Sequence, residues 1–345
     1  MPERVIGWDL GGAHLKAALA ENGILLHVVQ LPCRLWQGLA ELEAALGEAR
    51  SRLGPAPRHA VTMTGEMADL FVHRSAGVAA LVDGMEAGLA GTEIRYYAGP
   101  CGWLDAGGAR RNPLAVASAN WHASAAWAAH RLGDGLLLDI GSTTTDVVPF
   151  RGGKVCARGA DDASRLVSSE LVYTGVVRTP VMAMAESVPF RGESVPLMAG
   201  HFATSADVHR LTGALPESCD QQPAADGGAK IPEASARRLA RMLGRDFEEG
   251  EMGEWRELAR WLAARQAERI AAACAAVLAR EAIAPGAPLV CAGAGRFLVP
   301  DIARRIARPV ADFAGLAGRP GDEWTAICAP AAALALLASE PWEKS

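Results

Sequence analysis

The stretches GWDLGGAHLKAAL (7–19) and LLLDIGSTTTDVV (136–148) share one pattern. Each begins with an apolar run that ends at an aspartate, Asp9 or Asp139, then turns through glycine and small residues into a second apolar run. Apolar runs separated by glycine and small polar residues are typical of strands joined by tight turns. The sequence therefore predicts the same strand–turn–strand unit twice.

Both units continue into a third strand. In the first, Asn22-Gly23 lies between two apolar runs and predicts a type I′ hairpin turn, in which both central residues adopt positive φ. In the second, Gly152-Gly153 precedes a strand expected at 154–158. A duplicated unit of this kind predicts that each copy heads its own lobe.

The length of the chain and the order of its elements also predict two lobes. A chain of 345 residues exceeds what one hydrophobic core usually serves, and its strands and helices alternate as in α/β proteins. We expect an N-terminal lobe at 1–134, on which a helix at 325–345 packs back, and a C-terminal lobe at 135–324. Scattered glycine, proline and polar residues predict an irregular insertion in the second lobe at about 190–235.

Three longer segments have the composition of helices. We expect helices at 66–90 and 113–131, and a helical stretch over 234–283 that is interrupted near Gly250 to Gly253.

Composition and charge limit the classes of partner. The formal net charge of −5 at pH 7 gives no general attraction for nucleic acid or for an anionic membrane. No apolar run reaches the roughly 18 residues of a membrane span, and no signal-peptide pattern opens the chain. Seven cysteines without a C-x-x-C pair favour reduced thiols. We therefore expect a cytoplasmic protein with small-molecule substrates, and leave open whether it forms a homo-oligomer.

Both turns have the composition of a phosphate site. Backbone N–H groups and hydroxyls offer hydrogen bonds to an anion, and glycine lets phosphate oxygens approach the main chain closely. A strand follows each turn, whereas a helix follows the phosphate loops of Walker-A and dinucleotide-binding proteins. The predicted phosphate-binding residues are Gly11, Gly12, Gly141, Ser142, Thr143 and Thr144.

Charged residues at the turns predict how a polyphosphate would be held. Asp9 and Asp139 are candidate ligands of Mg²⁺, the alternative being that each carboxylate caps its own turn. Lys16 follows on the strand that leaves the first turn and is a candidate phosphate contact, the alternative being a solvated strand residue. Two such hairpins facing each other from two lobes would clamp one polyphosphate.

Two residues are candidates for proton transfer. Asp146, at the end of the second turn, is expected to act as a general base or as a second neighbour of the metal, the alternative being a brace of its own turn. His14, inside the first turn, is expected to donate to phosphate or to accept a proton, the alternative being a surface-loop histidine.

A third glycine turn follows a later apolar run. In VCAGAGRFLVPDIARRI (290–306) a strand ends at Gly293-Ala294-Gly295 and a helix follows. A lone G-x-G is a weak signal, so a tight packing turn and a nucleotide-like site both remain open.

Together the three turns resemble the phosphate-1, phosphate-2 and adenosine motifs of the actin/sugar kinase/Hsp70 superfamily. Within it, DIGSTTTDV (139–147) is similar to the pattern of the hydantoinase A/oxoprolinase family. The resemblance extends along nearly the whole chain to the hydantoinase-related subfamily linked to C1 transfer on tetrahydromethanopterin and methanofuran. It is carried there by ANWHASAAWAA (119–129), YTGVVRTPV (173–181), HFATSADVHRLTG (201–213) and ASARRLARMLGRD (234–246).

The resemblance implies a fold and an activity. The fold would be α/β and two-lobed, actin/Hsp70-like, a duplicated ribonuclease H-like architecture with a central cleft. The activity would be an alkyl transfer of methanofuran biosynthesis, with Mg²⁺ as cofactor. In it, the phenol oxygen of γ-glutamyltyramine displaces diphosphate from 5-(aminomethyl)furan-3-ylmethyl diphosphate.

Two other activities stay open. The commoner activity of the superfamily is that of an ATP-dependent kinase or a hydantoinase/oxoprolinase-like ATPase, in which Gly293 and Gly295 would hold adenosine. The other alternative is a non-catalytic, nucleotide-sensing partner of C1-pathway enzymes, against which the set of Asp9, Asp139 and Lys16 argues.

The resemblance also suggests substrate contacts. Arg178 is a candidate for the glutamyl carboxylate, because a guanidinium pairs bidentately with a carboxylate, the alternative being a structural ion pair. Asp207 is a candidate for the substrate ammonium, although its place also resembles a helix N-cap region. Asn120 and His122, expected on a helix between the lobes, are candidate substrate contacts, the alternative being ordinary helix positions. His201 and His209 depart from the family pattern, which expects an aromatic residue where His209 stands.

Overall fold

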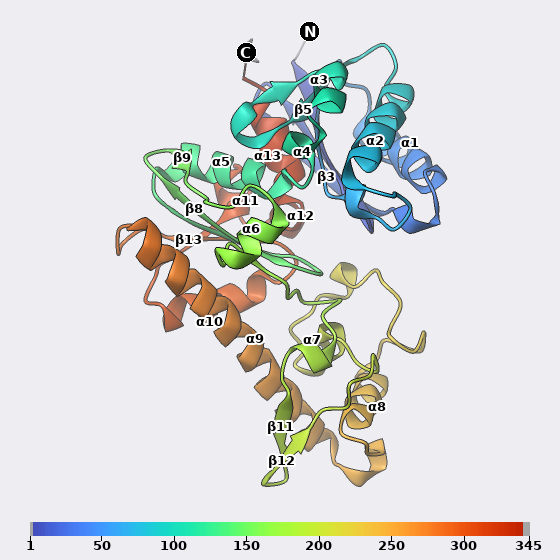
Figure 1. Ribbon diagram of the computed structural model, residues 1–345, viewed down its shortest axis with the longest axis vertical. Coiled ribbons are helices and arrows are strands. Elements are labelled where there is room, and N and C mark those ends of the chain that lie inside the picture. The colour runs from blue at the N-terminus through green and yellow to red at the C-terminus, as the bar shows by residue number, and fades with distance from the viewer. Residues whose placement is uncertain (1–2, 341–345) are drawn as a thin grey trace. The chain divides into compact units, whose positions relative to one another are not determined.

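The computed structural model describes residues 3–340 (Figure 1). The packing of the backbone divides the chain into two compact units. The first takes in the chain up to Leu137, then Val148–Ala157, and the chain from Ala311 onward. The second takes in Leu138–Val147 and Arg158–Val310. The lobe boundaries at 134/135 and 324/325, and the central cleft, stay predictions.

The first unit contains a six-stranded sheet in the order β3-β2-β1-β4-β5-β6. Strands β1, β2 and β3 form an antiparallel meander, while β1, β4 and β5 run parallel. The strands are β1 (Arg4–Leu10), β2 (His14–Glu21), β3 (Ile24–Pro32), β4 (Arg58–Met63), β5 (Glu93–Tyr97) and β6 (Trp103–Leu104). Asn22 and Gly23 have φ of 50° and 74°, so the predicted hairpin turn is confirmed.

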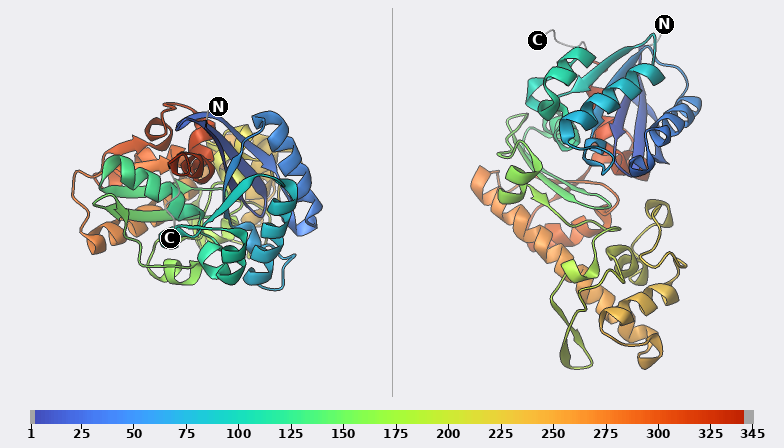
Figure 2. Two further views of the ribbon diagram at one scale, coloured as in Figure 1. Left: turned by 90° about the horizontal axis from the view of Figure 1, so that it is seen from above. Right: turned by 45° about the vertical axis from the view of Figure 1, so that its right-hand side comes forward.

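Helices cover both faces of this sheet (Figures 1 and 2). Helix α1 (Ala40–Leu53) and α2 (Arg74–Gly88) share a hydrophobic core with alternate residues of β1, including Ile6 and Trp8. Helix α13 (Ala329–Leu337) packs on β1, β2 and β4. A Cβ atom at Gly7 would lie 2.1 Å from the Ala331 carbonyl oxygen, so the contact of β1 with α13 needs glycine there.

The second sheet repeats the topology of the first. Its strands follow the order β10-β8-β7-β13-β14, with β9 also paired to β8, so β9-β8-β7-β13-β14 matches β3-β2-β1-β4-β5. The strands are β7 (Gly135–Ile140), β8 (Thr145–Arg151), β9 (Lys154–Val155), β10 (Leu171–Val172), β13 (Leu289–Ala292) and β14 (Val310–Asp312). Strand β9 ends before the predicted 158, and the unit boundary passes through β7 and β8.

The second unit has its own helical core. Apolar residues of α7 (Ser205–Leu211), α8 (Pro232–Met242) and α9 (Met252–Glu281) pack together with the hairpin of β11 (Ser187–Phe190) and β12 (Glu193–Pro196). The stretch at 190–235 therefore carries β12, α7, a short 3-10 helix and the start of α8 between its irregular loops. The break in the predicted helix over 234–283 runs from the end of α8 at Met242 to the start of α9 at Met252, which is wider than expected.

Two predicted helices are shorter than expected because tertiary contacts interrupt them. The segment at 66–90 starts within the 3-10 helix Gly65–Met67 and becomes α-helical only at Arg74, and Gly65 packs against Leu10. The segment at 113–131 divides into α4 (Pro113–Val116) and α5 (Asn120–Leu132), and Ala117 between them forms a parallel bridge to Met63.

The remaining elements are short. The α-helices are α3 (Ala106–Arg111), α6 (Asp162–Val167), α10 (Val299–Arg305), α11 (Phe313–Leu316) and α12 (Glu323–Ile327). The 3-10 helices are Leu35–Gln37, Gly65–Met67, Gly99–Cys101, Val181–Ala183, Glu217–Cys219, Phe247–Glu249 and Arg296–Leu298. Among residues 3–340, no helix combines the length and the apolar composition that a membrane crossing requires.

Candidate functional site

The first turn places a lysine opposite a buried aspartate. Asp9 lies near the end of β1, directly across from Lys16 on β2, and Lys16 Nζ is 3.5 Å from Asp9 Oδ2. The Asp9 side chain is 3% exposed and that of Lys16 25% exposed. Lys16 is therefore an ion-pair partner of Asp9 whose ammonium still reaches solvent, which is against the alternative of a merely solvated strand residue.

In the first turn, among the residues that the structure describes, backbone carbonyls are hydrogen-bonded within the protein, whereas two of the N–H groups are not. The Gly11 N–H donates to the His14 carbonyl at 3.0 Å and closes the turn. The carbonyls of Gly12 and Ala13 accept from Leu35 and Cys33. The N–H groups of Gly12 and Ala13 have no acceptor in the described part of the chain. They are available to an anion, as the composition of the turn predicts.

His14 is the first residue of β2 and is buried, which is against the alternative of a surface-loop histidine. Its expected role in proton transfer stays a prediction.

The second turn has the same closure. The Gly141 N–H donates to the Thr144 carbonyl at 2.8 Å, and Asp139 is buried two residues before Gly141 on β7. The N–H groups of Ser142 and Thr143 have no acceptor within residues 3–340, and the two hydroxyls lie 3.4 Å apart. This turn therefore offers hydroxyls as well as N–H groups to an anion.

Residues 175–178 support the second turn through backbone contacts. Sequence reasoning did not assign this segment to the turns. The N–H groups of Val176, Val177 and Arg178 donate to the carbonyls of Gly141 and Ser142 at 2.9–3.1 Å. A Cβ at Gly175 would lie 2.5 Å from the Ser142 carbonyl carbon and the Thr143 nitrogen. The glycine in YTGVVRTP is the signal that could have shown this close approach, because a backbone contact needs glycine.

The third turn packs on the strand that leads into the second. The Gly295 N–H donates to the Ile140 carbonyl at 2.8 Å. Gly293 has φ of +84°, and a Cβ there would lie 2.3 Å from Asp139 Oδ1. These contacts support the tight packing turn, and a nucleotide-like role of Gly293 and Gly295 stays a prediction.

Asp146 forms an ion pair with a buried arginine. Arg165 Nη2 donates to Asp146 Oδ1 at 2.8 Å and to the Glu170 carbonyl at 2.9 Å, and the Arg165 side chain is 1% exposed. The guanidinium stabilises the ionised carboxylate. This favours the bracing role of Asp146, and its assignment as a general base stays a prediction.

A buried polar chain links α7 and α9 to the segment behind the second turn. Gln266 Nε2 donates to Thr174 Oγ1 and to the Gly175 carbonyl, each at 2.8 Å. The amide oxygen of Gln266 therefore faces His209, whose Nε2 lies 2.7 Å away and must donate. The His209 ring also stands edge-on to Phe297. Burial lowers the pKa of His209 to about 4, so the ring is neutral at pH 7.

Asn120 and His122 lie at the start of α5 in the first unit. The Asn120 carboxamide oxygen accepts from the Trp121 N–H at 2.8 Å. His122 Nδ1 is 2.8 Å from the Tyr97 hydroxyl, and burial raises the pKa of Tyr97 above its usual range. Both residues have structural partners, and their substrate contacts stay predictions.

Glu66 is a buried carboxylate that sequence reasoning missed. It follows β4 within Thr64-Gly65-Glu66, and the neighbouring Gly65 packs against Leu10 and Gly11 of the first turn. The Ser118 hydroxyl donates to Glu66 Oε1 at 2.8 Å. An acidic residue directly after a buried parallel strand was the available signal.

A cavity of about 310 Å³ lies within the second unit, beside the second turn. Its lining includes Val177 and Arg178, whose N–H groups bond to the Ser142 carbonyl, together with His201, Asp207 and Arg210. The structure thus brings Arg178 and Asp207, two predicted substrate contacts, to one pocket.

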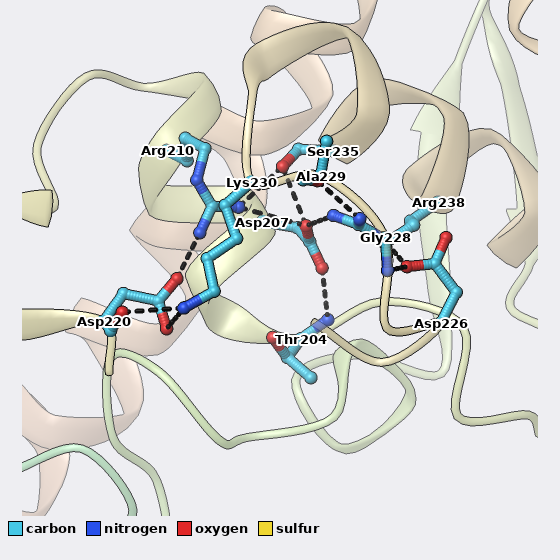
Figure 3. Close-up of polar contacts among 10 residues, drawn as sticks. All are labelled: Thr204, Asp207, Arg210, Asp220, Asp226, Gly228, Ala229, Lys230, Ser235 and Arg238. Atoms are coloured by element: carbon cyan, nitrogen blue, oxygen red, sulfur yellow. Dashed lines mark hydrogen bonds and ion pairs between the residues drawn. The ribbon is translucent and has the colours of Figure 1, made fainter. Parts of the chain in front are cut away.

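Asp207 is surrounded by donors from the protein (Figure 3). It accepts from the Thr204 N–H, from the Ser235 hydroxyl at 2.8 Å and from Arg238 at 2.8 Å, with Arg210 at 3.3 Å. Thr204 and Asp207 form a capping box at the start of α7. This favours the helix-capping alternative, and the predicted ammonium contact of Asp207 stays a prediction.

The donors at the turns are those that Mg²⁺ prefers. Asp9 and Asp139 offer carboxylate oxygens, and magnesium is commonly held by one or two carboxylates together with substrate phosphates. Within residues 3–340, no group of three or more His, Cys, Asp or Glu side chains is placed to hold a metal by itself. The metal role of the two aspartates stays a prediction.

Comparison with known proteins identifies relatives over most of the chain. Residues 58–340 match the family model described as hydantoinase/oxoprolinase. The (4-{4-[2-(γ-L-glutamylamino)ethyl]phenoxymethyl}furan-2-yl)methanamine synthase of Methanocaldococcus jannaschii is 32% identical over 71% of this chain and 72% of its own length. The synthase of the same name from Methanococcus vannielii is 31% identical over 32% of this chain and 50% of its own length.

Among solved structures, nucleotide-free acetone carboxylase superposes with a TM-score of 0.56 at 11% identity, over 97% of this chain and 70% of that one. Such a likeness supports the fold alone, and with the repeated sheet topology it confirms the expected α/β fold of the actin/Hsp70 class. The family model matches residues 58–340, which are most of this chain, so the chain belongs to the hydantoinase/oxoprolinase family.

Proposed function

We propose that this protein is an alkyl transferase of methanofuran biosynthesis that uses a diphosphate ester as alkyl donor. The observation that carries the proposal is the pair of equivalent turns, each with a buried aspartate and with N–H groups open to an anion. The names of the synthase relatives support the product, a phenoxymethyl furan with a γ-glutamyl amide. The clamp requires the two turns to face each other, and that arrangement is part of the proposal.

In the proposed reaction, the phenol oxygen of γ-glutamyltyramine bonds to the methylene carbon of 5-(aminomethyl)furan-3-ylmethyl diphosphate. The bond from that carbon to the diphosphate oxygen breaks, the phenol proton passes to a base, and diphosphate leaves. The furan ring stabilises the developing carbocation, so charge accumulates on the leaving diphosphate. Donors placed around that group stabilise the transition state more than the ground state.

The residues of the turns have distinct roles in this proposal. The N–H groups of Gly12, Ser142 and Thr143 bind diphosphate oxygens, and Lys16 adds a positive charge beside them. Asp9 and Asp139 would hold Mg²⁺, which supplies further positive charge to the leaving group.

Between the two candidate bases we favour His14. A phenol has a pKa near ~10 and needs a proton acceptor close to it at neutral pH. Asp146 is paired with Arg165 at 2.8 Å, whereas His14 is the first residue of β2, directly after the first turn.

The second candidate function is an ATPase or an ATP-dependent kinase. It is favoured by the likeness to acetone carboxylase, which carries out ATP-dependent acetone carboxylation. In that case Gly293 and Gly295 would hold adenosine.

One experiment separates the two functions. The purified protein is incubated with Mg²⁺ and the two proposed substrates, and product mass and released diphosphate are measured; a parallel sample contains Mg-ATP alone. We expect the coupled product and diphosphate in equal amounts, and no ADP. Steady ADP release without the furan substrate, with no coupled product, would favour the second function.

The metal assignment has its own test. Asp139→Asn keeps the size of the side chain and removes its charge. We expect diphosphate release to fall by about 100-fold or more, as for the loss of a major electrostatic contact in a transition state. Turnover at the wild-type rate would remove Asp139 from the proposed site.

A further inference from the structure

The cavity in the second unit carries several charges. Its ionisable lining residues are Arg178, His201, Asp207, Arg210 and Asp220, and residues 222–225 form part of its wall. Which charge such a pocket presents to a ligand depends on which of these groups are already paired.

Both carboxylates of the lining are paired within the protein (Figure 3). Asp207 has Arg210 and Arg238 as cationic partners. Asp220 also pairs with Arg210, and Lys230 Nζ lies 3.4 Å from Asp220 Oδ1. The carboxylates are therefore screened by three cations and have little attraction left for a positively charged ligand.

Arg178 differs from the other arginines of this cluster. Its side chain is exposed, and no carboxylate within residues 3–340 lies within ion-pair distance of its guanidinium. Its backbone is held, because its N–H donates to the Ser142 carbonyl at 2.9 Å. The pocket thus presents a cation that has no carboxylate partner among residues 3–340, on a main chain that is bonded to the second turn.

We propose that this pocket binds the carboxylate end of the acceptor, with the Arg178 guanidinium as its partner. The proposal rests on the proposed function and extends it to the recognition of the acceptor. A guanidinium binds a carboxylate through two parallel hydrogen bonds, and a cavity of about 310 Å³ has the size of a small-molecule site. The Arg178 N–H is bonded to the Ser142 carbonyl, and the proposal places the phenol end of the anchored acceptor toward the diphosphate turn.

A diphosphate oxygen is the other anion that could meet Arg178, because Ser142 belongs to the phosphate turn. The two sources differ in one experiment. Binding of γ-glutamyltyramine, of tyramine and of pyrophosphate is measured by calorimetry for the wild type and for Arg178→Gln. Tyramine has the same phenol but no carboxylate.

We expect Arg178→Gln to weaken γ-glutamyltyramine binding by about 10- to 100-fold, the range for a hydrogen bond to a charged group. Binding of tyramine and of pyrophosphate should not change. Arg178→Lys, which keeps the charge and loses the bidentate geometry, should lie between the two. The matched control is Arg237→Gln on α8, an exposed arginine outside the pocket lining, with wild-type binding of all three compounds.

Two results would overturn the proposal. Unchanged binding of γ-glutamyltyramine by Arg178→Gln would show that its carboxylate is recognised elsewhere. An equal loss of pyrophosphate binding would assign Arg178 to the diphosphate instead. If the wild type binds γ-glutamyltyramine through its carboxylate but releases no diphosphate, the proposed reaction is contradicted while the carboxylate site is supported. The failure of one proposal can therefore be told from the failure of the other.

Discussion

The two phosphate-type turns share one backbone and differ in charge. Both close by the same hydrogen bond, from the N–H of Gly11 to His14 and from the N–H of Gly141 to Thr144. Seven residues after each aspartate the first unit has Lys16 and the second has Asp146. Lys16 pairs with the aspartate of its own turn, whereas Asp146 pairs with a buried arginine from outside the turn.

The two turns are also supported differently. The first turn is contacted by the segment just after its own third strand, through Cys33 and Leu35. The second is contacted by residues 174–178, which are in turn bonded to α9 through Gln266. A duplicated backbone has thus kept its hydrogen-bond pattern while its charges and its supports diverged. We infer that the first turn supplies positive charge and the second supplies hydroxyls and a fixed position.

The largest effect, on the free energy of unfolding, is expected for the ion pair of Arg165 with Asp146 at the second turn. Arg165→Met leaves Asp146 without its cationic partner in a largely buried place. Breaking a buried ion pair by removing one partner costs about 3–5 kcal/mol, and Asp146, which is partly exposed, points to the lower end. Chemical denaturation measures this loss. The double variant Arg165→Met/Asp146→Asn should recover part of it, and a loss below about 1 kcal/mol in the single variant would contradict the buried ion pair.

The next effect tests the positive charge of the first turn. Lys16→Met should weaken pyrophosphate binding by about 10- to 100-fold, because a charged hydrogen-bond donor to phosphate is lost. Calorimetry is the measurement. Lys154→Met, a change of an exposed lysine on β9, is the matched control. If both variants bind pyrophosphate alike, Lys16 serves only its ion pair with Asp9.

A third prediction compares glycines of the two regions. Gly175→Ala places a methyl group 2.5 Å from the backbone of the second turn, and overpacking of this kind costs about 1–3 kcal/mol. Gly12→Ala in the first turn meets no atom within 4 Å and should leave stability unchanged. Thermal unfolding and pyrophosphate binding of both variants are compared. Equal behaviour would show that the close approach of Gly175 does not hold the second turn.

The smallest effect concerns pH and the support of the second turn. Because burial lowers the pKa of His209 from its ordinary value of 6.5 to about 4, the contribution of His209 to stability is complete above pH 6.5 and declines as the pH falls toward 4. His209→Phe should cost about 1–2 kcal/mol at pH 7, since it leaves the Gln266 oxygen without its donor. It should also lose less stability than the wild type between pH 6.5 and 4.

Thermal unfolding across that pH range measures the effect of His209. The wild type and the variant both keep His59, whose pKa is likewise lowered by burial to about 4, so some acid sensitivity remains. His27→Phe, on the exposed side of β3, should follow the wild-type pH profile. An unchanged profile for His209→Phe would contradict a neutral, buried His209.

The parts of the fold that depend on local chemistry could be predicted from the sequence. Asn22-Gly23 adopts positive φ in almost any setting, so the first hairpin follows from two residues. The helices at 66–90 and 113–131 were predicted too long, because Gly65 and Ala117 make contacts with β1 and β4 that no local pattern contains. Tertiary contacts override helix propensity at such places.

The same distinction applies to the candidate site. The turns and their aspartates are contiguous in sequence and could be identified there. Their partners are not contiguous: Arg165 is 19 residues from Asp146, and Gln266 is 92 residues from Thr174. The pairing of Asp207 with Arg238 likewise joins two helices, so only the structure shows that this carboxylate already has partners.

The packing of α13 against β1 has a consequence for how the chain acquires its structure during synthesis. Strand β1 leaves the ribosome more than 300 residues before the helix whose Ala331 meets Gly7. Until then one apolar face of the first sheet is uncovered and prone to associate with other nascent chains. Chaperone binding to ribosome-bound intermediates should therefore persist until residues 329–337 emerge, and should then end abruptly.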